Sequence, residues 1–391
     1  MEDTDNQDPI AELIENYHEL NSSAVHELHE EPSPLEFMRY VAKNTPFVVR
    51  GAAANWQATR TWNVGFLKEV LGEETVNVAV TPAGNADAPT LHTTPDGTSS
   101  LVFAKPHEED QAFPTFIDYL TTQSLSSSER EIRYAQTQND NLRNEYLPLF
   151  SHVPPSIPFA RIALDKQPDA INLWIGNDRS VTALHKDNYE NIYVQIAGKK
   201  HFVLLPPICH PCINEQHLQP AHYVRSSSSS SLDLVVETEE PKVPFATWDP
   251  DQPFLNETEY SCLAEPMRVT LEPGDMLYLP CMWYHKVSQS CSPEGMCVAV
   301  NYWYDMDFAG PLFPLTTFVK SVYKKEKEKE DDAAEDENPE GDGNGYANDN
   351  HDDDSDRETR RAAIFERIAQ LRAEREEALH KLAAEKEERH T

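Results

Sequence analysis

The sequence has few cysteines, no long apolar stretch and a shortage of basic residues, and each shortage argues against a class of protein. Six cysteines in 391 residues are too few for a fold held together by disulfides, so we expect a reduced, intracellular protein. No apolar run approaches the roughly 18 residues that a membrane-spanning helix needs, and the acidic first residues do not resemble a secretory signal. We therefore expect a cytoplasmic protein without a membrane partner, and we leave a nuclear fraction open.

The chain is strongly acidic, with 67 Asp and Glu against 33 Lys and Arg and a formal net charge of −34. Thirteen of the acidic residues, and no Lys or Arg, lie between Glu330 and Asp356. Such a block predicts a disordered acidic linker, which we place at residues 324–356. The rest of the chain is also acidic, which argues against tight binding to nucleic acid and favours a basic protein or peptide as partner.

The first half of the chain predicts helices and short strands around a core. Residues 1–32 predict an N-terminal helical segment whose inward face carries Ile10, Leu13, Tyr17 and Leu20 at helical spacing. Further helices are expected at 35–44, 62–72 and 115–123, and strands at 47–51, 75–82 and 132–138. Residues 83–100 are rich in Gly, Asn, Asp and Thr and predict a loop.

The second half predicts mostly strands. From Ala170 onward, short segments of alternating polarity are bounded by Gly, Pro and Asn or Asp turns. Many short strands of this kind are typical of a jelly roll. We therefore expect one mainly β domain over residues 33–323, with flanking helices around a double-stranded β-helix (jelly-roll or cupin) core. Six consecutive serines at 226–231 predict a flexible insertion in it.

The last segment, residues 357–391, is rich in Ala, Glu, Arg and Leu and predicts a charged C-terminal helix. Its apolar residues follow about three heptads, with an arginine at one position of the seam. This pattern fits a lone helix in solvent or a coiled coil, so a homodimer stays open.

Two histidines and an aspartate form the most informative pattern in the chain. His185 and Asp187 are two residues apart in a strand-like segment, and side chains at this spacing share one face of a strand. His285 lies in a later strand-like segment. Two histidines and one carboxylate leave three open positions on one side of an octahedral metal, as in non-haem Fe(II) oxygenases.

The strand after this motif predicts a lined pocket. Asn191, Tyr193 and Gln195 alternate with apolar residues, so a polar face lies within an apolar neighbourhood. The same alternation places Lys200 on one face with Phe202. A buried lysine is costly unless it meets an anion, and a small dicarboxylate would supply that anion.

Four short motifs together resemble a known family. They are T-x-x-H-x-D at 182–187, G-x-K at 198–200, W-Y-H at 283–285 and V-N-Y-W-Y at 300–304. This combination resembles the jumonji-C (JmjC) domains of the cupin-8-like group, which are Fe(II)- and 2-oxoglutarate-dependent oxygenases and include protein hydroxylases. The resemblance extends over about residues 8–323, and the serine run and the tail have no counterpart in it.

The resemblance implies a role for each residue of these motifs. His185, Asp187 and His285 would bind Fe(II), and dioxygen would be the second cosubstrate. Five further side chains would bind 2-oxoglutarate or line its pocket: Lys200, Thr182, Tyr134, Asn191 and Asn301. Among these, Lys200 would pair with the distal carboxylate of 2-oxoglutarate, while Thr182 and Tyr134 would donate hydroxyl groups to it.

The resemblance also implies a protein substrate. The favoured reaction is hydroxylation of a lysine at carbon 3 in developmentally regulated GTP-binding proteins, which are GTPases of the translation-factor class. Demethylation of Lys or Arg in histones or other proteins is the alternative reaction. A catalytically silent cupin that acts as an interaction scaffold is an alternative of another class, but such a protein would be expected to lose a ligand, and this chain has all of them.

A competing metal motif lies in the loop after Pro207. Cys209, Cys212, His217 and His222 have the spacing C-x2-C-x4-H-x4-H, which resembles a zinc knuckle. The glycines that let a knuckle fold tightly are absent, so we favour ordinary loop residues and leave zinc binding open.

Overall fold

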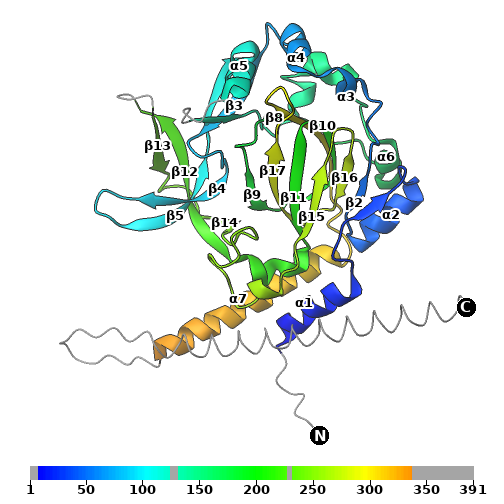
Figure 1. The fold of residues 1–391 in the computed structure, drawn as a ribbon. Helices are drawn as coiled ribbons and strands as arrows, with labels where there is room; N and C mark the ends of the chain where they lie inside the picture. Colours follow the sequence, from blue (N-terminus) through cyan, green and yellow to red (C-terminus); the bar gives the residue numbers. More distant parts are fainter. Residues whose placement is uncertain (1–7, 124–130, 227–230, 337–391) are drawn as a thin grey trace, which may run out of the picture.

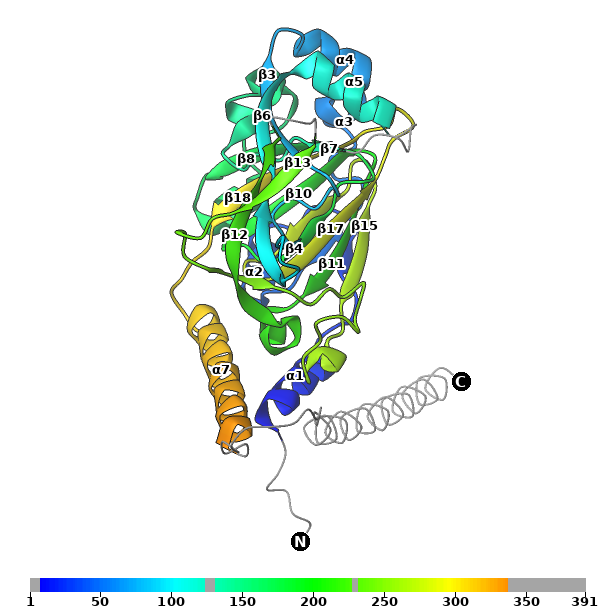
Figure 2. The same ribbon diagram turned by 90° about the vertical axis from the view of Figure 1, so that its left-hand side faces the viewer.

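Two facing β-sheets form the centre of the protein. A computed structural model describes residues 8–123, 131–226 and 231–336 (Figure 1). The larger sheet has six strands in the order β1 (His26–Leu28), β2 (Phe47–Val49), β16 (Met276–Leu279), β10 (Tyr189–Ala197), β18 (Cys297–Asp305) and β8 (Ala170–Gly176). The smaller sheet has four in the order β15 (Met267–Leu271), β11 (Lys199–Leu205), β17 (Tyr284–Ser290) and β9 (Thr182–His185). Figures 1 and 2 show the jelly-roll arrangement that the strand pattern predicts.

Alternation along β10 separates two cores. Ile192 and Val194 belong to the core between the larger sheet and the helices, whereas Tyr193 belongs to the core between the two sheets. A tight turn at Gly198 then leads into β11. The φ of Gly198 is 68°, in the left-handed region, and a Cβ there would lie 2.6 Å from the carbonyl oxygen of Ser290. Only glycine fits this turn without strain.

Helices cover the outer face of the larger sheet (Figure 1). They are α2 (Pro34–Lys43), α3 (Gln57–Thr61), α4 (Val64–Val70), α5 (Phe113–Gln123) and α6 (Pro158–Leu164), with short 3₁₀ turns η1 (Asn141–Arg143) and η2 (Leu147–His152). Buried side chains of this layer, such as Phe37 and Phe116, contact the same core as Ile192. The helices therefore hold the larger sheet from behind and leave its other face to the site.

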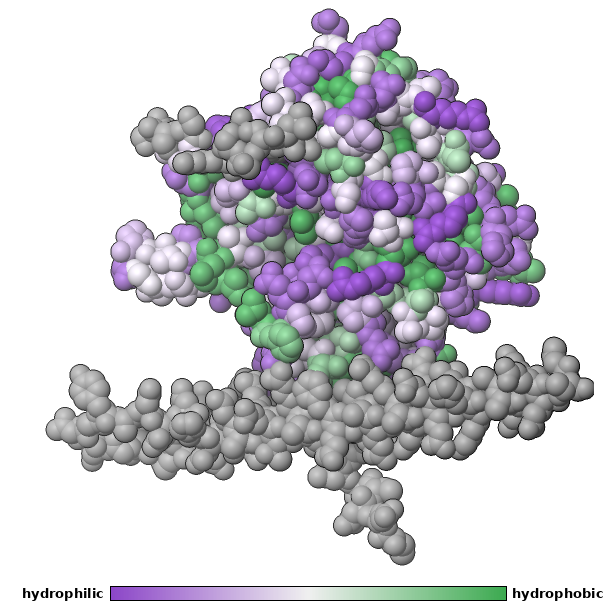
Figure 3. Space-filling model, in the orientation of Figure 1, coloured by the Kyte–Doolittle hydropathy of each residue, from purple (hydrophilic) through white to green (hydrophobic). Residues whose placement is uncertain are grey.

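Two smaller sheets extend the jelly roll. One contains β6 (His107–Ala112), β3 (Thr75–Thr81) and β7 (Ile132–Tyr134). The other, the outer sheet, contains β13 (Leu232–Val236), β12 (Glu215–Arg225), β5 (Ser99–Lys105), β4 (Ala88–Thr93) and β14 (Val243–Ala246). The loop predicted at 83–100 is therefore wrong, because β4 and most of its turn to β5 lie there. Figure 3 shows a largely hydrophilic surface with apolar residues gathered along the outer sheet.

The serine run joins β12 to β13. The backbone N–H of Ser226 donates to the carbonyl of Ser231, so the two ends of the run lie side by side. Residues 227–230, and with them the predicted flexibility, lie outside the described residues.

Helices α1 (Pro9–Leu20) and α7 (Leu312–Asp336) lie at one end of the molecule (Figure 2), where both contact η3 (Pro207–Ile213). The second 3₁₀ turn there is η4 (Ser261–Leu263). The inward face predicted for the first helix is partly wrong: Ile10 and Ile14 are buried, whereas Leu20 is 84% exposed. In the part of the chain that the structure describes, no helix is both long and apolar enough to span a bilayer.

Helix α7 also corrects a boundary. The sequence prediction ended the domain at residue 323 and began a linker at 324, but the helix continues without a break to Asp336. Its Lys- and Glu-rich part is favourable for a helix, and Lys324 pairs with Glu328 one turn later at 3.6 Å. The remainder of the predicted linker, and the predicted helix at 357–391, lie outside the described residues.

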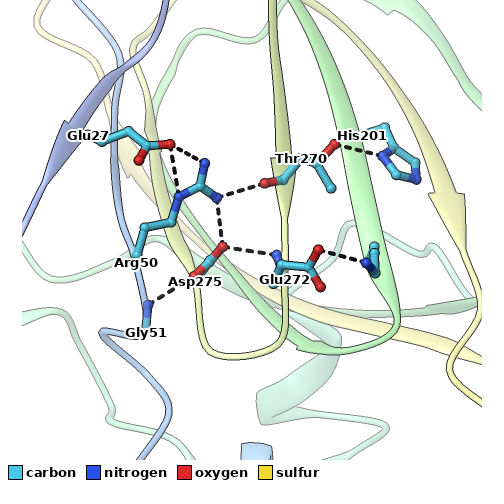
Figure 4. A network of polar contacts seen from close by, with 8 residues as sticks. Glu27, Arg50, Gly51, His201, Thr270, Glu272 and Asp275 are labelled. Carbon is cyan, nitrogen blue, oxygen red and sulfur yellow. Dashed lines mark hydrogen bonds and ion pairs between the residues drawn. The ribbon is translucent and has the colours of Figure 1, made fainter.

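A polar network joins the edges of the two central sheets (Figure 4). Asp275, just before β16, accepts hydrogen bonds from the guanidinium of Arg50 at 2.7 Å and from the backbone N–H groups of Gly51 and Glu272 at 2.9 and 3.0 Å. Arg50 also donates to the carbonyl of Thr270 in β15 at 2.8 Å. Asp275 is only 4% exposed, so it is the buried centre of this connection.

Replacing Asp275 with alanine is expected to lower the free energy of unfolding by about 2–4 kcal/mol, because two backbone donors and a guanidinium lose their acceptor. The control is Glu27→Ala, which removes the more exposed partner of Arg50, with a side chain 57% exposed; we expect a loss below about 1 kcal/mol. Urea unfolding followed by circular dichroism measures both. Equal losses in the two variants would contradict the role given to Asp275.

Candidate metal and cosubstrate site

Three side chains meet at the opening between the two central sheets. His185 ends β9, His285 lies opposite it in β17, and Asp187 follows two residues after His185. The Asp187 Oδ2 atom lies 3.8 Å from Nε2 of His185 and 3.6 Å from Nε2 of His285. Among the described residues this is the one group of three or more His, Cys, Asp or Glu side chains whose ligand atoms converge within 4.8 Å. The structure thus brings together the triad that the sequence predicts.

Backbone carbonyls orient both imidazole rings. Nδ1 of His185 lies 2.8 Å from the carbonyl oxygen of Ala183, and Nδ1 of His285 lies 3.0 Å from that of Trp283. A carbonyl oxygen can only accept, so each Nδ1 carries the proton and each Nε2 keeps a free lone pair. This is the arrangement in which histidines bind metals.

Burial keeps the His285 ring neutral. Desolvation, reinforced by the neighbouring His185, lowers the pKa of His285 to about 4. Metal binding requires a neutral imidazole, and this ring therefore needs to lose no proton at neutral pH. Two nitrogens and one carboxylate oxygen fit a divalent iron well.

A buried ammonium lies deeper in the same cavity. Lys200 is 2% exposed, and its Nζ donates to the hydroxyl of Tyr134 at 2.7 Å. Burial alone would lower the pKa of Lys200, but the interactions with Tyr134 and Tyr193 outweigh it and hold the pKa above its usual value. Burial raises the pKa of Tyr134, so that phenol stays protonated. Thr182 hydrogen-bonds to Tyr134 as well, and together these groups offer a cation and two hydroxyls.

Two asparagines form the wall between Lys200 and the opening. Asn301 accepts from the indole N–H of Trp174 at 2.8 Å and donates to the side-chain oxygen of Asn191 at 3.1 Å. This chain of hydrogen bonds fixes both amide orientations and leaves the amide N–H groups of Asn191 for a ligand. All eight residues predicted from the sequence line one cavity: Tyr134, Thr182, His185, Asp187, Asn191, Lys200, His285 and Asn301.

Unused polar groups show that the deep end of the cavity suits an anion. Lys200 forms no ion pair with a carboxylate of the described residues. Gln289, opposite Lys200 in β17, is 5% exposed, and neither its amide nitrogen nor its oxygen has a partner. A Cβ on Gly176 would come within 2.5 Å of this amide and 2.8 Å of the Tyr134 ring. Glycine therefore makes room here, and the residues present fit a small dicarboxylate such as 2-oxoglutarate.

Sequence reasoning missed part of this cavity. Gln138, Trp174 and Val287 also line it, and Gln289 lies opposite Lys200 in the neighbouring strand. The alternation along β17 was the available signal, because His285, Val287 and Gln289 share one face of that strand.

The competing zinc motif is not assembled. Cys209 and Cys212 are buried in η3, His217 is exposed on β12, and His222 lies 2.8 Å from Glu237. The partner of Cys209 is instead His18 of α1, with Sγ and Nε2 3.8 Å apart. The four residues of the spacing motif therefore do not converge on one point.

The buried ring of His210, in the same turn, should make the folded protein less stable in acid. Its Nδ1 lies 3.0 Å from the Tyr284 hydroxyl, and burial lowers the pKa of His210 from 6.5 to about 4. Between these values the unfolded chain binds a proton that the folded protein does not, so stability falls as the pH falls through this window. His210→Gln removes this dependence. Between pH 7 and about pH 4.5 we expect the wild type to lose roughly 2 kcal/mol more than the variant, measured by urea unfolding; equal losses would contradict the assignment.

Comparison with known proteins agrees with this geometry. A family model described as "Cupin-like domain" matches residues 32–310. The chain is 38% identical over 288 residues to "Lysine-specific demethylase JMJ32" of Arabidopsis thaliana, covering 71% of this chain and 81% of that protein. It is 36% identical over 286 residues to "Bifunctional peptidase and (3S)-lysyl hydroxylase JMJD7" of Homo sapiens, covering 73% and 85%. It is 33% identical over 313 residues to "JmjC domain-containing protein E" of Dictyostelium discoideum, covering 76% and 88%.

Proposed function

Because the chain belongs to the cupin-like JmjC oxygenase family, we propose that it is an Fe(II)- and 2-oxoglutarate-dependent dioxygenase that hydroxylates a lysine side chain of a protein. The family resemblance read from the motifs is thereby confirmed, and the family generally uses these two cofactors. The observation that carries the proposal is the buried ammonium of Lys200, which lies in one cavity with the His185–Asp187–His285 triad and has no carboxylate partner there.

Each group of the site then has a task. His185, Asp187 and His285 would hold the iron, which when bound supplies the redox chemistry by which dioxygen oxidises the target carbon and converts 2-oxoglutarate to succinate and carbon dioxide. The carbonyls behind each Nδ1 keep both imidazole rings in the metal-binding tautomer. Lys200 would bind the distal carboxylate of 2-oxoglutarate by a charge-assisted hydrogen bond, with the hydroxyl groups of Tyr134 and Thr182 as further donors.

The wall of the cavity would position the cosubstrate. Asn301 is fixed by Trp174 and in turn fixes Asn191, so neither amide needs to rotate when a ligand binds. Such preorganised polar groups cost little reorganisation during reaction. Phe202, which is buried, also lines the cavity and adds an apolar side chain beside these polar groups.

Lysine hydroxylation and lysine demethylation both have support from the relatives. The human relative is named a lysyl hydroxylase and the Arabidopsis relative a demethylase, at 36% and 38% identity. The motif resemblance favours hydroxylation at carbon 3, with a translation-associated GTPase as the target. The complete and converging triad argues against a purely scaffolding cupin.

The products distinguish the two reactions. The purified protein would be supplied with Fe(II), 2-oxoglutarate, heavy-isotope dioxygen and matched lysine and methyl-lysine peptides drawn from candidate GTPases and histones. Hydroxylation leaves one heavy oxygen on the lysine peptide, whereas demethylation removes a methyl group and releases formaldehyde. We expect the first product. Loss of a methyl group without retained oxygen would instead support demethylation as the reaction. His185→Ala serves as the inactive control.

A further inference from the structure

The strands that form the cavity wall continue outward to its mouth. Three successive cross-strand pairs of β10 and β18 share one face: Tyr193 with Asn301, Asn191 with Trp303, and Tyr189 with Asp305. The first two pairs line the cavity, and residues two apart along a strand face the same way. Tyr189 and Asp305 therefore form the next row, on the side where the cavity opens.

An aromatic surface spans this row and the row of Asn191 and Trp303 before it. The rings of Tyr189 and Trp303 are stacked, with centroids 4.8 Å apart and planes 5° apart. Trp303 is 7% exposed, and its indole N–H is buried without an acceptor. The mouth therefore offers an aromatic surface made of two stacked rings.

Two acidic residues flank this aromatic surface. Asp305 lies directly opposite Tyr189 in the pairing of β10 with β18, and Asp169 directly precedes Ala170, which lies opposite Trp303 in the pairing of β18 with β8. The backbone N–H of Asp169 donates to the carbonyl of Trp303 at 2.8 Å, which fixes its position at the start of β8. Lys166 donates to the backbone carbonyl of Asp305, and within the described ranges no Lys or Arg forms an ion pair with the carboxylate of Asp169 or Asp305.

We propose that Tyr189, Trp303, Asp169 and Asp305 form a cation site at the mouth, which binds the ammonium of the target lysine and selects lysine over uncharged side chains. This inference rests on the proposed lysine oxidation. An ammonium held over an aromatic face and between carboxylates gains from both. Tyr189 follows Asp187 by two residues, a span of at most about 7 Å of chain, which is close to the length of an extended lysine side chain. The ammonium can therefore occupy this row while a carbon of the same side chain lies at the triad.

Small probes test the site without knowledge of the natural substrate. N-acetyl-lysine methylamide and N-acetyl-norleucine methylamide differ mainly in the ammonium, and ligand-observed NMR would measure their affinities for protein supplied with Mn(II) and 2-oxoglutarate. We expect wild type to prefer the lysine probe and Asp305→Asn to reduce that preference by about fivefold to tenfold. Tyr189→Leu, which keeps an apolar side chain but removes the ring, should also reduce it.

The matched control is Asp233→Asn, on the exposed side of β13, which removes the same charge elsewhere and should leave the preference unchanged. An equal fall in both Asp variants, or no preference in wild type, overturns the cation site. If the preference depends on Asp305 but no lysine peptide is oxidised, the cation site stands and the proposed reaction fails. If lysine peptides are hydroxylated with the same KM by wild type and Asp305→Asn, the reaction stands and the cation site fails.

Discussion

Lys200→Met is expected to weaken 2-oxoglutarate binding by roughly a hundredfold or more, because a buried carboxylate would lose the ammonium that pairs with it. Methionine has a similar length and no charge, so the cavity keeps its shape. Tyr134 and Thr182 would still donate hydrogen bonds, but neutral hydroxyls do not replace an ammonium. Calorimetric titration of 2-oxoglutarate into protein supplied with Mn(II) in place of iron measures the change directly.

The adjacent lysine provides the control. Lys199 points to the other side of β11, where it pairs with Glu272 at 2.7 Å and its side chain is 47% exposed. Lys199→Met should leave 2-oxoglutarate affinity unchanged within about twofold, since an exposed ion pair contributes little. Similar losses in the two variants would show a general charge effect and would contradict the assignment of Lys200.

His185→Ala is expected to abolish metal retention and to lower turnover by roughly a thousandfold or more. Loss of a group that only orients a metal ligand already lowers metal affinity or activity by about 10–100-fold. The His185 side chain is 23% exposed, so its removal should be tolerated by the fold better than removal of the buried His285. Metal content after dialysis, measured by mass spectrometry, reports binding independently of activity.

His217→Ala is the control for this variant. His217 is exposed on β12 and belongs to the zinc spacing motif that the structure does not assemble, so its loss should change neither metal content nor turnover. If His217→Ala loses metal while His185→Ala retains it, the metal site has been assigned to the wrong residues. If His185→Ala retains full biological function, the scaffold hypothesis replaces the enzyme.

The structure brings the predicted site residues into one cavity, and part of the signal that pointed to them is local. His185 and Asp187 are fixed relative to each other by the two-residue period of a strand, and the same period places Lys200 among inward-facing residues. His285 comes from a distant segment, and only its motif connected it to the others. The register between β9 and β17, which sets His285 opposite His185, depends on the whole jelly roll and could not be derived from spacing.

Other features depend on tertiary contacts that no local pattern contains. The periodicity of α1 allows more than one inward face, and the contact of Ile10 and Ile14 with the core around Cys209 selects one. The hairpin of β4 and β5 is rich in polar and turn residues, from which composition alone predicts a loop. The pairing of β5 with β12 stabilises the two strands. Nothing in the local sequence distinguishes Gln289 from an ordinary strand residue. The register between β11 and β17 is what places it opposite Lys200.

We propose that the triad binds iron and, together with Lys200, 2-oxoglutarate. Anaerobic addition of Fe(II) and 2-oxoglutarate to the purified protein tests it most directly, because a 2-oxo acid that chelates iron gives a weak visible charge-transfer absorption. We expect this absorption in wild type and in His217→Ala, a shift to much higher 2-oxoglutarate concentration in Lys200→Met, and none in His185→Ala. Folded, iron-supplied wild type that shows neither the absorption nor 2-oxoglutarate binding would contradict the account.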